Sequence, residues 1–141
     1  MVQMKRSLNG IPVTRAMQTD FAMLTPRDTL SRVVGLVLAG SQHDFPVVQD
    51  GYIVGLLDRD TFMKALSERN QSATVEEVMR RDVTEIDSHE KVETALTRLQ
   101  ENGSKTLPVT QDGQLVGLIT SESIKKFLMI HSALRTAGGM A

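Results

Sequence analysis

Two four-residue segments, 58–61 (DRDT) and 120–123 (TSES), carry the side chains best suited to meet a ligand. Each follows an apolar run that contains Val-Gly-Leu and opens a stretch that favours a helix. The first turn of a helix exposes backbone N–H groups and partial positive charge, which together suit a phosphate. Thr120 could add a hydroxyl donor there, whereas Asp58 would satisfy the same N–H groups itself and bring negative charge, increased by Asp60 and partly offset by Arg59. We therefore predict one helix start that accepts an anion and one that rejects it.

No other group of residues predicts catalysis or a metal centre. The histidines His43, His89 and His131 are far apart in the sequence and lack the spacing of metal ligands. The chain has no cysteine, which excludes disulfides, thiolate zinc sites and thiol catalysis. No nucleophile can be paired with a base. We expect a protein that is not an enzyme, requires no cofactor and holds no metal.

The composition indicates a folded, soluble domain. The chain has 141 residues, of which 40% are apolar and 23% charged, with a formal net charge of -1. It lacks the basic excess that would favour nucleic acid as a partner, and no apolar run approaches the roughly 18 residues that span a bilayer. Residues 1–13 contain a small basic cluster without the apolar stretch of a secretory signal. We expect a cytoplasmic protein, or the cytosolic part of a larger one, without direct membrane insertion.

The chain is an internal duplication with a constant offset. Gly55 matches Gly117, and the same separation of 62 positions, as 117 minus 55 shows, relates the two copies from about Val13 to Leu128 without a gap. A constant offset over a whole unit does not arise by chance. We therefore predict two repeats, at residues 13–69 and 75–135, with a linker around residues 67–74. The ends, residues 1–12 and 136–141, are predicted to be flexible.

Each repeat is predicted to contain, in order, a strand, a helix, two strands and a second helix. Extended segments are expected around residues 23–24 and 84–86. Apolar residues at helical spacing then predict a helix with a buried stripe. These stripes consist of Leu30, Val33, Val34, Val37 and Leu38 in the first repeat and of Val92, Ala95, Leu96 and Leu99 in the second. Pro26, after Thr25, is expected to open the first of these helices, and D-x-x-E at residues 87–90 is expected to form a capping box for the second.

A hairpin and a closing helix complete each repeat. Asp-Gly between two β-branched runs, at Asp50 and again at Asp112, is a strong hairpin signal. The closing helices are expected to begin at Asp58 and Thr120, both good N-cap types. A unit of about 60 residues would be marginally stable alone. We therefore predict an α+β fold in which the two β-α-β-β-α repeats pack their apolar faces together with pseudo-two-fold symmetry.

These patterns resemble a pair of CBS domains, often called a Bateman module. The resemblance rests on V-x-x-x-M-x-x-D at the head of each repeat, F/L-P-V before the hairpin and V-G-L into the closing helix, in the same order twice. It covers the chain from residue 13 to about 134. It implies a non-catalytic regulatory or sensory unit that commonly binds adenine nucleotides or related adenosyl ligands and usually dimerises.

The resemblance also implies where a ligand would bind. In the family pattern G-h-h-[S/T]-x-x-D, the hydroxyl meets phosphate and the acid binds both ribose hydroxyls. The second repeat keeps Thr120 but has Ser123 in place of the acid, and serine could make only one hydrogen bond to ribose. The first repeat has Asp58 and Thr61 at these places, so its site is predicted to be degenerate. The strand residues expected around the adenine are Val83, Thr84, Pro108 and Val109 for the second repeat, and Leu24, Pro46 and Val47 for the degenerate site.

Two functions remain open at this point. One is a sensor of AMP, ADP, ATP or S-adenosylmethionine; the other is a ligand-free homodimerisation or interaction module in which Asp58 and Thr120 are only helix caps. A narrower similarity is carried by residues 40–48, 78–83 and 127–135 (GSQHDFPVV, VMRRDV and FLMIHSALR). These resemble the CBS pair at the cytosolic end of site-2-protease-type intramembrane metalloproteases. This similarity implies such a protease as a fused or associated partner.

Overall fold

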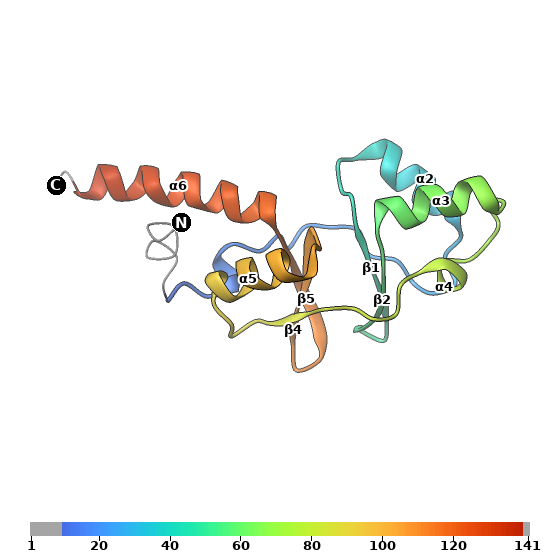
Figure 1. Cartoon of the computed structure of the whole chain (residues 1–141), viewed down its shortest axis with the longest axis horizontal. Helices are drawn as coiled ribbons and strands as arrows, with labels where there is room; N and C mark the ends of the chain where they lie inside the picture. Colours follow the sequence, from blue (N-terminus) through green and yellow to red (C-terminus); the bar gives the residue numbers. More distant parts are fainter. Residues whose placement is uncertain (1–9, 140–141) are drawn as a thin grey trace. The chain divides into compact units, whose positions relative to one another are not determined.

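The computed structural model describes the backbone of residues 10–139 and the side chains of residues 10–136 (Figure 1). Its helices and strands, in chain order, are η1 (Val13–Arg15), α2 (Leu30–Ala39), β1 (Phe45–Gln49), β2 (Tyr52–Leu57), α3 (Arg59–Glu68), α4 (Val75–Val78), β3 (Ile86–Asp87), α5 (Val92–Asn102), β4 (Thr106–Gln111), β5 (Gln114–Thr120) and α6 (Ser121–Gly139). They form two compact units, and each is described by itself. The first unit comprises Asp20–Thr84 and Asp112–Leu115; the second comprises the described residues up to Thr19, Glu85–Gln111, and those from Val116 onward.

The first unit is built on the antiparallel hairpin of β1 and β2, with α2 and α3 packed against it (Figure 1). Asp50 and Gly51 both have positive φ, 55° and 85°, which fits the two-residue turn predicted from Asp-Gly. Leu24 pairs in parallel with Val47 and extends the sheet. The core contains residues from every one of these segments, namely Leu24, Leu30, Val33, Phe45, Val47, Leu57, Phe62, Ala65, Val75 and Met79.

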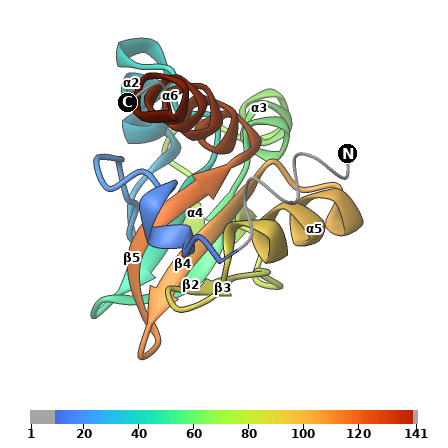
Figure 2. The same cartoon turned by 90° about the vertical axis from the view of Figure 1, so that its left-hand side faces the viewer.

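The second unit repeats this arrangement with β4 and β5, which lie side by side in Figure 2. β3 pairs in parallel with β4, with Ile86 opposite Val109, and α5 contacts α6. Asp112 and Gly113, at the tip of the β4–β5 hairpin, group with the first unit and have positive φ angles of 53° and 83°, close to those of the first tip. The core residues are Val13, Ala16, Ile86, Val92, Ala95, Leu99, Leu107, Val109, Ile119 and Ile124.

A segment at the head of each repeat, residues 11–18 for the first and 73–80 for the second, belongs to the unit that holds the other repeat's hairpin. We call these two the exchanged segments. Val13, from the first repeat, is fully buried in the second unit, and Val75, from the second repeat, is fully buried in the first unit. Equivalent backbone bonds hold the two segments. The Val13 N–H donates to the Glu90 carbonyl at 2.9 Å, and the Val75 N–H donates to the Asp28 carbonyl at 2.7 Å. Each compact unit is thus completed by the exchanged segment that leads into the other repeat.

This exchange explains why two predicted helix starts are wrong. The first helix begins at Leu30, not at Pro26, which lies in the preceding turn. Its first amide, on Leu30, donates to the Ala73 carbonyl at 3.0 Å, so a carbonyl of the exchanged segment takes the place of a side-chain cap. In the second unit the Val92 amide donates in the same way to the Ile11 carbonyl at 2.8 Å.

The expected capping box at residues 87–90 is also absent. Asp87 instead accepts hydrogen bonds from the backbone N–H and Nδ1 of His89, both at 2.8 Å, in the turn before α5. A capping box does occur at Thr74 and Glu77, where the sequence predicts the end of a linker, and it opens α4. Leu38, expected in the buried stripe of the first helix, is 81% exposed near the end of α2.

The predicted flexible ends lie partly outside the described residues. Residues 1–9 and 140–141 fall outside the described part of the chain, whereas α6 continues through Gly139. Within residues 10–139, no helix combines the length and the apolarity needed to cross a bilayer.

Candidate functional site: two helix starts with different caps

A glycine in each Val-Gly-Leu run lets the exchanged segment lie directly on the strand that leads to the closing helix. A Cβ on Gly55 would stand 2.5 Å from Met79 Sδ and 2.9 Å from the Arg80 carbonyl oxygen. A Cβ on Gly117 would overlap Met17 Sδ and stand 3.0 Å from the Gln18 carbonyl oxygen. Real Cβ atoms do not approach this closely. These glycines are therefore required by packing, and they stand three residues before the two predicted caps.

At the start of α6, Thr120 and Ser123 cap the helix reciprocally. The Ser123 N–H donates to Thr120 Oγ1 at 2.8 Å, and the Thr120 N–H donates to Ser123 Oγ at 2.9 Å. The Ser123 hydroxyl also donates to the Thr120 carbonyl at 3.0 Å, and the residue is 7% exposed. The predicted hydrogen bond from Ser123 to a ribose would therefore require this hydroxyl to leave the cap.

Thr120 differs from Ser123 in its hydrogen bonding. Its Oγ1 accepts one hydrogen bond, and no acceptor for the hydroxyl hydrogen is found among the described residues. The side chain is only partly buried. A threonine hydroxyl can donate once and accept as well, so Thr120 can cap α6 and still donate to an external oxygen.

At the start of α3, a carboxylate replaces this hydroxyl. Asp58 Oδ1 accepts from the Thr61 N–H at 2.7 Å, and Oδ2 lies 3.4 Å from Arg80 Nη1. Burial alone would raise the pKa of Asp58, but the hydrogen bonds from Thr61 and Arg80, with the Arg80 charge, together lower it below its ordinary value. Asp58 is thus an ionised cap with an ion-pair partner of its own.

The cation beside Asp58 is not the one expected from the sequence. Arg59 directs its Nη1 toward His43 Nδ1, at 3.1 Å, whereas Arg80 reaches Asp58 from the exchanged segment of the second repeat. Sequence reasoning missed Arg80 because it treated each repeat as closed on itself. The constant offset makes Arg80 equivalent to Gln18, but it does not indicate which unit either residue joins.

The strand residues predicted to surround the adenine at the second repeat's site do not all lie in one unit. Pro108 and Val109 lie in the second unit with Thr120 and Ser123, whereas Val83 and Thr84 belong to the first unit. Val109 is fully buried, as are Leu24 and Val47 in the first unit, and Pro46 and Pro108 are also buried. Leu24, Val47 and Val109 thus pack inside their own cores, and an adenine could meet only their backbone.

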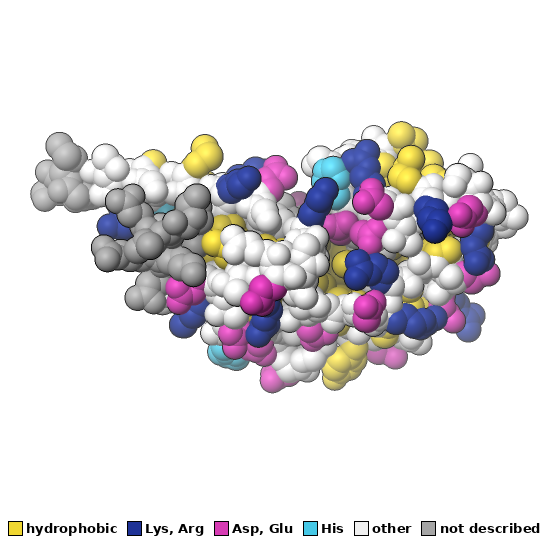
Figure 3. All heavy atoms as spheres, viewed as in Figure 1, with side chains coloured by type: hydrophobic (Ala, Val, Ile, Leu, Met, Phe, Trp, Pro, Cys, Tyr) yellow, Lys and Arg dark blue, Asp and Glu magenta, His cyan; other side chains and the backbone are white. Residues whose placement is uncertain are grey.

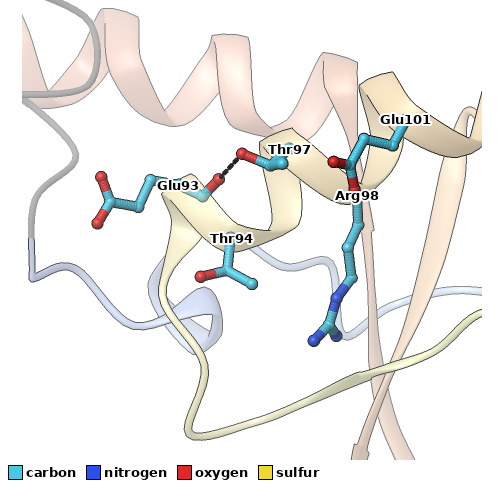
Figure 4. Close-up of a pocket in the computed structure, with 5 residues that line it drawn as sticks. All are labelled: Glu93, Thr94, Thr97, Arg98 and Glu101. Carbon is cyan, nitrogen blue, oxygen red and sulfur yellow. Dashed lines mark hydrogen bonds between the residues drawn. The ribbon is translucent and has the colours of Figure 1, made fainter.

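An open hollow of about 410 Å³ lies along α5, and neither Asp58 nor Thr120 lines it (Figure 4). All five residues that line it, Glu93, Thr94, Thr97, Arg98 and Glu101, come from this one helix. The Thr97 hydroxyl donates to the Glu93 carbonyl at 3.0 Å within the helix. No cluster of three or more histidine or acidic side chains that could hold a metal ion was found in the described part of the chain.

Comparison with known proteins places both repeats in one family. The family model described as CBS domain matches residues 11–68 and 75–130. An uncharacterized protein of Methanocaldococcus jannaschii is 25% identical over 119 residues, which is 83% of this chain and 42% of that protein. The chain thus spans less than half the length of this relative.

Solved structures share the fold. The structure of CBSX2, in complex with AMP, matches with a TM-score of 0.75 and 19% identity over 85% of this chain and 97% of that chain. The CBS domain pair of protein MJ0100, in complex with 5-methylthioadenosine and S-adenosyl-L-methionine, matches with a TM-score of 0.71 and 22% identity over 83% of this chain and 98% of that chain. The predicted α+β fold of two tandem repeats is confirmed: this chain belongs to the CBS domain family, with one domain in each repeat.

Proposed function

We propose that this CBS pair is a non-catalytic regulatory module that binds an adenosine-containing ligand at one site, the start of α6. The observation that carries the proposal is the difference between the two caps. Thr120 caps α6 without adding charge and keeps a hydroxyl hydrogen to donate. Asp58 fills the equivalent position with a carboxylate that already has a partner in Arg80. A phosphate would be attracted to the first arrangement and repelled by the carboxylate of the second.

The ligand class is supported by two relatives. CBSX2 was solved with AMP and the MJ0100 pair with S-adenosyl-L-methionine, and both share this fold. We extend to this chain a preference for AMP, ADP, ATP or S-adenosylmethionine. Because Ser123 replaces the expected acid and its hydroxyl is engaged in the cap, we expect binding to be weak.

The proposal is tested by titrating these four ligands into the wild-type chain and Thr120→Ala, following the melting temperature and the heat of binding. A ligand present at 100 times its Kd should stabilise the fold by about 2.7 kcal/mol. We expect this stabilisation to be lost in Thr120→Ala. Thr97→Ala is the matched control, because Thr97 lies on α5 and bonds only within that helix. An unchanged wild-type melting temperature with all four ligands at millimolar concentration would contradict the proposal, as would equal binding by Thr120→Ala.

A second candidate is a homodimerisation module that needs no ligand, and the observation behind its dimerisation is a set of apolar side chains exposed to solvent. Leu38 and Met63 are 81% and 52% exposed on α2 and α3 of the first unit. On α6 of the second unit, Met129, Ile130 and Leu134 are 72%, 61% and 67% exposed. Figure 3 shows apolar side chains at the surface over α2 and along α6. Exposed apolar groups gathered in this way are typical of protein interfaces.

Light scattering over a range of concentrations tests this candidate. A homodimer should approach twice the monomer mass as concentration rises, and Leu38→Lys or Leu134→Lys should prevent it if the substituted helix lies in the interface. A monomer at every concentration would exclude this candidate. Because the ligand titration is independent of the scattering, either function can fail without the other.

The regulated partner belongs to the proposal as well. The narrower similarity found in the sequence favours an intramembrane metalloprotease as the partner and a cytoplasmic location for this chain. Co-purification of the tagged chain with such a protease from the same cells would support this part of the proposal. Recovery of the chain with only soluble proteins would contradict it.

A further inference from the structure

We propose that the exchanged segments, residues 11–18 and 73–80, position the helix cap of the opposite repeat. The cap at Thr120 then depends on a segment about 100 residues earlier in the chain, and the cap at Asp58 depends on one about 20 residues later. Residues 11–18 would control the cap at Thr120, and residues 73–80 the cap at Asp58. This coupling goes beyond ligand binding, because it would exist with or without a ligand.

Each segment is held by its unit at both of its ends. At its beginning, the Ile11 carbonyl accepts from the Val92 amide, the first amide of α5. At its end, Gln18 and Leu118 exchange two backbone hydrogen bonds, of 2.7 and 2.9 Å. In the first unit Ala73 accepts from Leu30 in the same way, at 3.0 Å. Its other end is held by two bonds of 2.9 Å between Arg80 and Leu56.

The second attachment lies next to the cap. Leu118 is two residues before Thr120 on β5, and the strand continues without a loop into α6. Met17 packs over Gly117, one residue earlier on the strand. Moving the segment away would remove both hydrogen bonds of Leu118 to Gln18 and uncover Gly117, leaving the strand end less constrained.

In the first unit the connection reaches the cap itself. Leu56 is two residues before Asp58, and Met79 packs over Gly55 as Met17 packs over Gly117. The side chain of Arg80 then extends to Asp58, with Nη1 at 3.4 Å from Oδ2. One residue thus both ends the exchanged segment and pairs with the capping carboxylate.

Gly117→Ala and Gly55→Ala are the matched variants that test the proposal on the full chain. A Cβ at either position forces the covering segment to shift. Two measurements follow: trypsin cleavage after Arg15 or after Arg80 and Arg81, identified by mass, and hydrogen exchange of the Ser123 and Thr61 amides, which donate to the two caps. Arg15, Arg80 and Arg81 are all exposed, so trypsin can report on each segment.

We expect each variant to affect one segment and one cap. Gly117→Ala should speed cleavage after Arg15 and exchange of the Ser123 amide by about tenfold, with the Thr61 amide unchanged. Gly55→Ala should speed cleavage after Arg80 and Arg81 and exchange of the Thr61 amide instead. Faster exchange of both amides to the same extent in either variant would overturn the proposal. So would faster cleavage after Arg15 with a Ser123 amide as protected as in the wild type.

Milder variants keep the test decisive if an alanine at Gly117 prevents folding. Met17→Ala removes contacts over Gly117 without adding an atom, so cleavage after Arg15 and exchange of the Ser123 amide should become faster by a smaller factor. In Met17→Leu both rates should return toward the wild-type values. A purely structural role for Met17 would lower the melting temperature without a selective change at Ser123, and this result would also overturn the proposal.

A last measurement rests on the proposed function. Coupling between sites is reciprocal, so a ligand at the start of α6 should slow cleavage after Arg15 and leave cleavage after Arg80 and Arg81 unchanged. If AMP binds and has no selective effect at Arg15, the coupling is wrong while ligand binding stands. If none of the four ligands binds, the ligand proposal fails, and the glycine variants still decide the coupling.

Discussion

The two compact units hold their exchanged segments in equivalent ways and differ at the helix starts. In both, a glycine before the cap is covered by a methionine, and the leading segment pairs with the strand two residues before the cap. The first unit then places Asp58 with Arg80 at the cap, and the second places Thr120 with Ser123. Duplication has therefore kept the backbone arrangement and changed the charge at the ends of two equivalent helices.

Truncating the equivalent core residues of α3 and α6 should produce the largest effects. Phe62 and Ile124 stand 62 positions apart, as 124 minus 62 shows, and are 2% and 1% exposed. Phe62→Ala should reduce the free energy of unfolding by about 3–5 kcal/mol and Ile124→Ala by about 2–5 kcal/mol, because each leaves a cavity. Urea denaturation measures both.

Met63→Ala is the control for these truncations, because this neighbour of Phe62 is 52% exposed. Its cost should stay within about 0.5 kcal/mol, as for most surface substitutions. A loss below about 1 kcal/mol for either core variant would mean that the equivalent positions do not support the two units in the same way.

Exchanging the caps should have a smaller effect on stability and a clear effect on binding. Asp and Thr are both good N-cap residues, so Thr120→Asp should change the free energy of unfolding by less than about 1 kcal/mol. It should nevertheless abolish binding of a phosphate-bearing ligand at α6, because it puts a carboxylate where the Thr120 hydroxyl would donate to the phosphate. Chemical denaturation and a melting curve with ATP separate the two effects.

The reverse change, Asp58→Thr, completes the comparison. It removes the carboxylate and frees Arg80, so the start of α3 should gain affinity for a phosphate. Because Thr is also a good cap, the cost in unfolding free energy should be no more than about 1 kcal/mol, from the lost ion pair. Unchanged ATP binding in both exchanged variants would show that cap charge does not determine where a ligand binds.

Features of the fold that depend on local sequence could be predicted, and features that depend on the exchange could not. Asp50 and Asp112 were expected in hairpin turns, and both adopt the positive φ that such turns require. The starts of α2 and α5 were misplaced because their first amides donate to Ala73 and Ile11. Both carbonyls belong to exchanged segments, and neither the Thr29 side chain before α2 nor the Lys91 side chain before α5 forms a cap hydrogen bond.

In the candidate site, too, the features that depend on local sequence could be predicted and the others could not. Thr120 and Asp58 were expected to begin their helices, and each accepts the hydrogen bond of an N-cap. The reciprocal bonds that engage Ser123 depend on a side-chain rotamer, which residue type alone does not determine. Arg80 could have been found only by assigning the leading segment to the opposite unit, where it reaches Asp58.

The smallest expected effect concerns the ion pair that distinguishes the first cap. The pKa of Asp58 is lowered from its ordinary value of 3.8, so its contribution to stability is present above that value and is lost as pH falls through the folded-state pKa. Arg80→Gln removes the guanidinium and leaves the Thr61 hydrogen bonds in place. The pKa of Asp58 should therefore rise toward its ordinary value, which an NMR titration of the side-chain carboxyl can follow.

The matched control for this variant is Arg81→Gln, because Arg81 donates to the Glu76 carbonyl and not to Asp58. At neutral pH Arg80→Gln should cost no more than about 1 kcal/mol, since Arg80 is half exposed and also lies 3.9 Å from Asp82. That cost should disappear at a pH low enough to protonate Asp58. If Asp58 titrates at the same pH in both variants, Arg80 does not act on the cap, and the difference between the two helix starts is carried by residues 58 and 120 alone.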